Sequence, residues 1–120
     1  MIVSRKIERV ESILFGGAHF VRITTDDGVT GLGQSACWAY PKATAQVVAS
    51  FRDYLVGQDP GRIEHHWQHL YRMGPFRGSI LGAAVSAVDI ALWDIKGSGC
   101  RRRSGNCWAA GAEIAFGCIC

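Results

Sequence analysis

A long apolar stretch from Ser79 to Gly97 constrains the fold of this chain more than any other feature. Its apolar side chains recur at helical spacing in two adjacent stripes, so that little of the helix surface is polar. Such a helix must be buried, and the small residues Gly82, Ala83 and Ser86 allow other segments to pack on it from several sides. Ser79 is expected to cap its first turn, and Gly97 to end it in a left-handed conformation.

Three β-strands are expected ahead of this helix. Residues 6–15 form a β-rich run that ends at two glycines, and residues 19–25 alternate apolar with polar side chains. Residues 29–35 return along the sheet after a turn at residues 26–28, where Gly28 tolerates the positive φ of a tight turn. These runs predict an antiparallel meander.

Two shorter helices are expected between the sheet and the long helix. Residues 42–55 are amphipathic, and Gly57 ends this helix. Asp59 and Pro60 suit the cap and the first turn of a second helix that runs to Arg72. Its buried stripe is expected to consist of Ile63, Trp67, Leu70 and Tyr71. The sequence therefore predicts an α+β fold in which a three-stranded antiparallel meander precedes a three-helix bundle.

The length and composition indicate one small globular domain. The chain has 120 residues, of which 48% are hydrophobic, an ordinary share for a soluble globule. It has no run of about 18 apolar residues and no signal-peptide pattern, so we expect a cytoplasmic protein without a membrane partner. Its net charge of +3 comes mostly from residues 98–120, and the near-neutral remainder does not favour a nucleic-acid partner.

His65 and His69 are the first candidates for a chemical site. They lie four residues apart on the second expected helix, a spacing at which two imidazoles can share a metal ion. However, they fall opposite the apolar stripe, and neither an HExxH glutamate nor a third ligand accompanies them. A solvated helix face is the preferred interpretation.

Asp89 and Asp94 interrupt the long apolar helix, and paired carboxylates can act as acid and base. Five residues apart on a helix, they point about 140° apart, which excludes a catalytic dyad. We expect each to pair with a cation or a backbone donor, because a buried carboxylate needs a partner. Gly31 and Gly33 follow a strand, but they lack the third glycine and the following helix of a dinucleotide-binding fingerprint.

The cysteines and arginines near the C-terminus do not form a recognisable site. The gaps between Cys100, Cys107, Cys118 and Cys120 match no common zinc motif. Three consecutive arginines at 101–103, without interleaved aromatic residues, are typical of a solvated run. The sequence therefore predicts no metal site and no catalytic residue within this chain.

Two motifs carry a resemblance to a known family. They are T-D-D-G-V-T-G-L-G at residues 25–33 and S-A-V-D-I-A-L-W-D-I-K-G at residues 86–97. In this order and at this separation they resemble the N-terminal capping domain of the enolase superfamily, in its mandelate racemase and muconate lactonizing enzyme branch. The likeness covers about residues 6–97 and is strongest to the sugar-acid dehydratases. The motifs do not separate dehydratases from racemases and cycloisomerases.

The resemblance implies that this domain packs over a (β/α)₈ barrel, which carries the Mg²⁺ ligands and the bases that remove a proton α to a carboxylate. That barrel is not in this sequence and is the expected missing partner. Mg²⁺ and an acid-sugar substrate then belong to the parent enzyme, for which a homo-oligomer is expected. The chain alone is expected to bind no cofactor and to be inactive.

The family pattern stops after Gly97. Members commonly continue towards V-W-Q-L-L-G-G, whereas this chain reads S-G-C-R-R-R-S-G-N-C-W-A-A-G. The codons of residues 106–109, read one base earlier, encode Leu-Leu-Gly, and the two preceding codons permit Trp-Gln. We infer a frameshift, in the gene or in its sequencing, that leaves a capping domain of residues 1–97 and a poorly ordered tail of residues 98–120.

Two cap loops, one between the first two strands and one after the third, are expected to bind substrate through Phe15, His19, Trp38 and Tyr40. His19 is a hydrogen-bond partner for a polar ligand, and the three aromatic residues exclude water. Alternatively, the aromatic residues only pack against the barrel. The chain is thus expected to be the truncated substrate-specificity lid of a Mg²⁺-dependent dehydratase or related racemase. The alternative is a stand-alone, non-catalytic binding or oligomerisation module.

Overall fold

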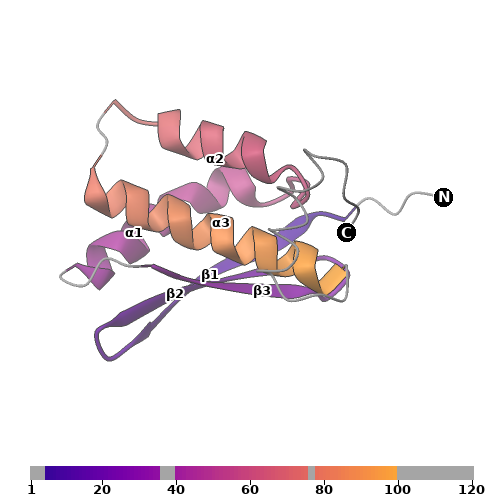
Figure 1. Cartoon of the computed structure of the whole chain (residues 1–120), viewed down its shortest axis with the longest axis horizontal. Coiled ribbons are helices and arrows are strands. Elements are labelled where there is room, and N and C mark those ends of the chain that lie inside the picture. Colours follow the sequence, from indigo (N-terminus) through magenta and orange to yellow (C-terminus); the bar gives the residue numbers. More distant parts are fainter. Residues whose placement is uncertain (1–4, 36–39, 76–77, 100–120) are drawn as a thin grey trace, which may run out of the picture.

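The computed structural model describes residues 5–35, 40–75 and 78–99, which form a three-stranded sheet followed by three helices (Figure 1). The elements are β1 (Ile7–Phe15), β2 (Ala18–Thr25), β3 (Thr30–Ser35), α1 (Pro41–Leu55), α2 (Ile63–Arg72) and α3 (Ser79–Gly99). The strands are antiparallel and adjacent in chain order. The predicted α+β fold is confirmed.

Tight turns join the three strands. Gly16 has φ +60° in the two-residue loop that joins β1 to β2, where Phe15 lies opposite Ala18. Positive φ at the first loop residue is the geometry of a hairpin turn that favours glycine. Gly28 has φ +87° in the turn between β2 and β3, as the sequence predicts.

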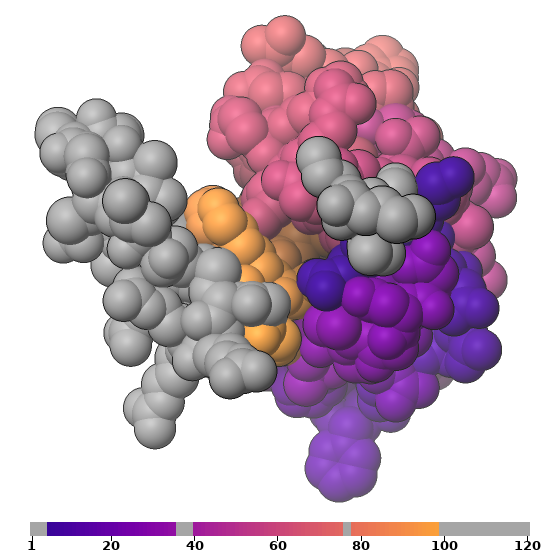
Figure 2. Space-filling model, turned by 90° about the vertical axis from the view of Figure 1, so that its right-hand side faces the viewer, coloured from indigo at the N-terminus to yellow at the C-terminus, as the bar shows by residue number. Residues whose placement is uncertain are grey.

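Helices α1 and α3 pack on one face of the sheet, and α2 lies against α3 on the side away from the strands (Figure 1). Viewed from the end where α3 finishes, the orange α3 borders pink residues above it and purple residues of the strands beside it (Figure 2). The core consists of inward-facing strand residues and the buried helix stripes. Its largest fully buried apolar side chains include Ile7, Ile23, Leu55, Leu70 and Leu92.

Backbone-to-backbone contact holds α3 against β3. A Cβ atom added to Gly31 would lie 2.1 Å from the carbonyl oxygen of Ala91, and one added to Gly33 would lie 2.0 Å from that of Ala87. No side chain fits at either position. The two glycines therefore allow the helix to pack closely on the strand. This role agrees with the prediction that they do not belong to a dinucleotide-binding motif.

Both edges of the sheet are partly covered. Near the start of β1, the N–H of Ile7 donates to the carbonyl of Gln58, and the N–H of Gly57 donates to the carbonyl of Ile7. At the other edge, the N–H of Leu32 in β3 donates to Oδ2 of Asp94 at 3.0 Å. Covered edges offer fewer free backbone groups to a foreign strand.

Three predicted helix boundaries are wrong. Helix α2 begins at Ile63 because the carboxylate of Asp59 accepts a hydrogen bond from Gly61 N–H, closing a turn before the helix. Helix α3 has Gly78 at its N-cap, since Gly82 N–H donates to the Gly78 carbonyl.

At its other end, α3 continues to Gly99, and Gly97 is a buried helical residue without positive φ. The predicted tail beyond residue 99 lies outside the described residues. Within the described ranges, none of the three helices combines the length and hydropathy that a bilayer crossing requires.

Candidate functional site

The two loops predicted to bind substrate start from the same end of the sheet. His19 follows the β1–β2 turn and lies directly opposite Ser35, the last residue of β3. Tyr40 precedes α1, and its carbonyl accepts hydrogen bonds from the N–H and hydroxyl of Thr44. Trp38 lies outside the described residues. The topology therefore brings together the described parts of both loops.

Large apolar side chains are exposed at this end. Phe15 is 78% exposed at the hairpin tip, Leu14 is 46% exposed beside it, and Tyr40 is 60% exposed at the start of α1. Single exposed apolar residues are common on protein surfaces. Here, however, they flank two loops that start side by side, which makes this end a candidate docking or ligand-covering surface.

His19 differs from the other candidates because its ring is buried. Only 1% of the residue is exposed, and Nδ1 shares a hydrogen bond with Oγ of Ser35 at 3.0 Å. Nε2 has no hydrogen-bond partner among the described residues. Burial lowers the pKa of His19 below its usual 6.5, so the ring is neutral at pH 7. His19 therefore lies beneath the loops and not on their surface.

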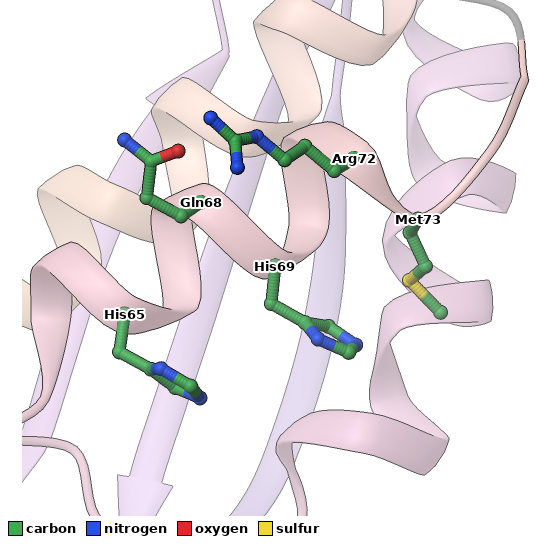
Figure 3. A pocket seen from close by; sticks show the side chains of 5 residues that line it. All are labelled: His65, Gln68, His69, Arg72 and Met73. Atoms are coloured by element: carbon green, nitrogen blue, oxygen red, sulfur yellow. The ribbon is translucent and has the colours of Figure 1, made fainter.

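His65 and His69 lie on the exposed face of α2, as the sequence predicts. Both point to the same side of the helix, whereas Gln68 and Arg72 point away from them (Figure 3). These four residues and Met73 line an open hollow of about 480 Å³. The centroids of the two imidazole rings are 6.5 Å apart, and the His69 ring stacks on Tyr54.

The described residues provide no donor set for a metal. Within residues 5–35, 40–75 and 78–99, no three His, Cys, Asp or Glu side chains gather closely enough to hold a metal ion. Two imidazoles with no third ligand also fall short of the three or four protein ligands that zinc sites use. The Mg²⁺ that the family resemblance implies therefore does not fit the described residues.

A buried histidine, His66, was not predicted from the sequence. The residue is fully buried between α2 and α1; its Nε2–H donates to the Asp59 carbonyl at 2.7 Å, and Nδ1 accepts from the Tyr54 hydroxyl at 2.9 Å. Burial lowers the pKa of His66. A signal was present, because His66 shares helical spacing with buried Ile63 and Leu70. The apolar Trp67, chosen for that stripe instead, is only partly buried.

The two aspartates of α3 have separate environments. Asp94 pairs with a backbone donor, the N–H of Leu32, as predicted. Asp89 is half-buried. Its pKa is raised mainly by burial and, to a smaller extent, by the nearby charge of Glu64. Within the described part of the chain, neither a cation nor a backbone donor pairs with Asp89, so its expected partner stays a prediction. The two carboxylates do not form a joint site.

Comparison with known proteins gives consistent matches over most of the described chain. Residues 16–102 match the family described as mandelate racemase / muconate lactonizing enzyme, N-terminal domain. The D-galactonate dehydratase of Ralstonia pickettii is 46% identical over 79 residues, which are 65% of this chain and 21% of that enzyme.

Solved structures agree with this match. An enolase from Pantoea ananatis with bound D-gluconate and Mg has a TM-score of 0.76 at 33% identity, over 80% of this chain and 25% of that one. A member of the enolase superfamily from Salmonella Typhimurium has a TM-score of 0.75 at 31% identity, over 80% and 26%. This chain thus spans about a fifth of the dehydratase and a quarter of each structure.

Proposed function

The chain belongs to the mandelate racemase / muconate lactonizing enzyme family as its N-terminal domain, and from this premise we propose that it is the capping domain of an acid-sugar dehydratase. In this role its loops cover the substrate and help to select it. The sequence resemblance that led to the family is confirmed by the match at residues 16–102. The substrate class is proposed because D-galactonate dehydratases are 46% identical over 79 residues.

The observation that carries the proposal is the common origin of the two loops. The β1–β2 turn and the end of β3 lie side by side, because His19 pairs with Ser35 in the sheet register. Phe15 and Tyr40, both more than half exposed, stand where such loops would meet another domain or a ligand. Loops on a rigid scaffold are frequent sites of recognition.

The chemistry is assigned to the parent enzyme and not to this chain. In the proposed enzyme, a (β/α)₈ barrel would supply the base that removes the proton α to the carboxylate, and its carboxylates would hold the Mg²⁺ that supplies Lewis-acid chemistry. Phe15, Trp38 and Tyr40 contribute walls that exclude water. The chain alone, with Mg²⁺ and a panel of acid sugars, is expected to show neither dehydration nor α-proton exchange in deuterated buffer.

The test begins with the genomic DNA beyond codon 97. An intact barrel in the neighbouring frame supports a capping domain, whereas a true stop favours a stand-alone module. In the restored enzyme, Phe15→Ala, Trp38→Ala and Tyr40→Ala should change the ranking of kcat/KM among acid sugars. Val56→Ala is the matched control, because Val56 is also an exposed apolar residue but lies beside Gly57, which pairs with the opposite end of β1.

If the three loop variants keep the ranking of the unmodified enzyme, as the Val56→Ala control should, the loops do not select the substrate. If the restored enzyme dehydrates no acid sugar, the proposed substrate class is wrong.

A further inference from the structure

The side chain of His19 bridges the bases of the two loops. His19 is separated from the turn glycines Gly16 and Gly17 by one residue, and Ser35 is the last residue of β3. Their side chains lie directly opposite each other on the helix-covered face of the sheet, with Nδ1 of His19 3.0 Å from Oγ of Ser35. One hydrogen bond therefore connects the two points at which the chain leaves the sheet.

A row of three side chains crosses the sheet at this level. Leu14 in β1 lies opposite His19 in β2, and His19 lies opposite Ser35 in β3. Directly opposite side chains in antiparallel strands are close enough to interact. His19 thus holds the middle position of a row that spans all three strands just below the hairpin tip.

The hairpin tip has few other restraints on its position. Phe15 and the two turn glycines are exposed, and a Cβ atom added at either glycine would meet nothing within 4 Å. The orientation of such a tip depends on the strands below it and on the side chains that tie those strands together. The hydrogen bond between His19 and Ser35 is a polar interaction that joins β2 to β3 just below the hairpin tip.

An imidazole is energetically unfavourable at a buried position whose only role is to fill space. Its Nε2 is buried without a partner among the described residues, and moving a polar nitrogen out of water has a desolvation cost. An apolar side chain of similar volume would fill the same space without that cost. What an apolar residue cannot supply is the hydrogen bond to Ser35.

We propose that His19 is a positioning residue, whose hydrogen bond to Ser35 couples the hairpin tip at residues 15–18 to the end of β3. This inference rests on the proposed capping function and changes the role of His19 in it. The buried ring does not contact substrate; it fixes the relative position of the segments that do. Loss of the hydrogen bond should loosen both loop bases together while the rest of the sheet keeps its order.

The test uses amide hydrogen exchange in the 120-residue chain, followed by NMR. His19→Leu and Ser35→Ala each remove the bond, and Ser35→Ala changes the core so little that folding is retained. His19→Asn is the conservative variant, because its amide reaches the position of Nδ1 and keeps the bond to Ser35. His19→Gln is the matched control, because its amide reaches the position of Nε2.

In His19→Leu, Ser35→Ala and His19→Gln, exchange of the amides at positions 18 and 35 should accelerate about tenfold, the effect of losing one hydrogen bond of ordinary strength. His19→Asn should exchange as the unmodified chain does. The Val29 amide, at the other end of the sheet, should change in none of them. The coupling is refuted if the amides at positions 18 and 35 do not respond, if Val29 accelerates equally, or if His19→Asn behaves like His19→Leu.

The restored enzyme then separates this inference from the proposed function. If the coupling operates there, His19→Asn retains the ranking of acid sugars, whereas His19→Leu and Ser35→Ala alter kcat/KM in the same direction and are not additive when combined. Additive effects would overturn the coupling. An enzyme inactive on acid sugars refutes the proposed function alone, since the exchange result is obtained without any substrate.

Discussion

Asp94 in α3 accepts a hydrogen bond from the backbone N–H of Leu32 in β3 at 3.0 Å, across 62 residues of sequence. The carboxylate thus occupies a backbone donor at the open side of an edge strand. Asp94→Ala should lower the free energy of unfolding by about 1 kcal/mol, the usual net value of one hydrogen bond. It should also promote edge-to-edge association. Urea titration and light scattering measure the two effects.

Asp53→Ala is the control for that change, because Asp53 is an exposed carboxylate on α1. It should leave both stability and association near those of the unmodified chain. Equal losses in the two variants would mean that the bond to Leu32 contributes nothing specific.

Gly33→Ala should be severely destabilising. The new Cβ would lie 2.0 Å from the Ala87 carbonyl oxygen, so α3 would have to move away from β3. Overpacking of this kind costs about 1–3 kcal/mol or more. Thermal unfolding followed by circular dichroism would show the loss.

Gly82→Ala, in α3 itself, should have the opposite effect. Nothing lies within 4 Å of the added Cβ, and alanine is the better helix former. This variant should gain about 0.4–1 kcal/mol. A tolerated Gly33→Ala, or a damaging Gly82→Ala, would contradict the observed packing of α3.

Stability should fall as the pH drops below about 6.5. Burial lowers the pKa of both His19 and His66 in the folded chain, so the unfolded chain binds more protons below the unfolded pKa of 6.5. Each group can contribute a slope of up to about 1.4 kcal/mol per pH unit. Urea titrations between pH 8 and pH 5 measure this slope.

His66→Gln should flatten part of the slope, because the titrating ring is removed while a donor to the Asp59 carbonyl is kept. Tyr54→Phe removes the hydroxyl that donates to His66 but keeps the ring of His66. It should lower stability most at pH 8, where the neutral ring accepts this bond, while a slope from the remaining imidazole persists. A slope that persists unchanged in His66→Gln would exclude His66 as its source.

Asp89→Asn should stabilise the chain at pH 7. The carboxylate is half-buried with its pKa raised by burial and by Glu64, so its charged form is disfavoured there. Removal of that charge should gain about 0.5–1 kcal/mol, as other surface-charge optimisations do. Asp53→Asn is the matched control. Loss of stability in Asp89→Asn alone would show that the carboxylate has a favourable partner.

The elements themselves could be predicted because each has a clear local signal. Alternation placed Val21 and Ile23 on one face of β2, and Gly28 marked the second turn. Asp94 was expected to find a backbone donor, because a carboxylate on a buried helix requires one. In each case the local sequence and the tertiary structure favour the same conformation.

The errors arose where tertiary contacts compete with local preference. Asp59 is a residue type that often caps helices. Its carboxylate instead accepts a hydrogen bond from Gly61 N–H, and its carbonyl accepts one from Nε2–H of His66. Gly97 resembles a helix stop, but it is buried and remains helical. The burial of His19 follows from the parity that it shares with Val21 and Ile23 along β2, whereas its expected contact with a ligand stays a prediction.

The covered edges of the sheet also set the order in which a nascent chain can be protected. The three strands are synthesised first and can form the whole meander. The groups that cover its edges are synthesised later, at Gly57 to Gln58 and at Asp94. At about 5–20 residues per second, Asp94 follows Ser35 by about 3–12 seconds. During that interval the meander has exposed strand edges and an apolar face, so the yield of folded protein depends on chaperone occupancy and translation rate as well as on final stability.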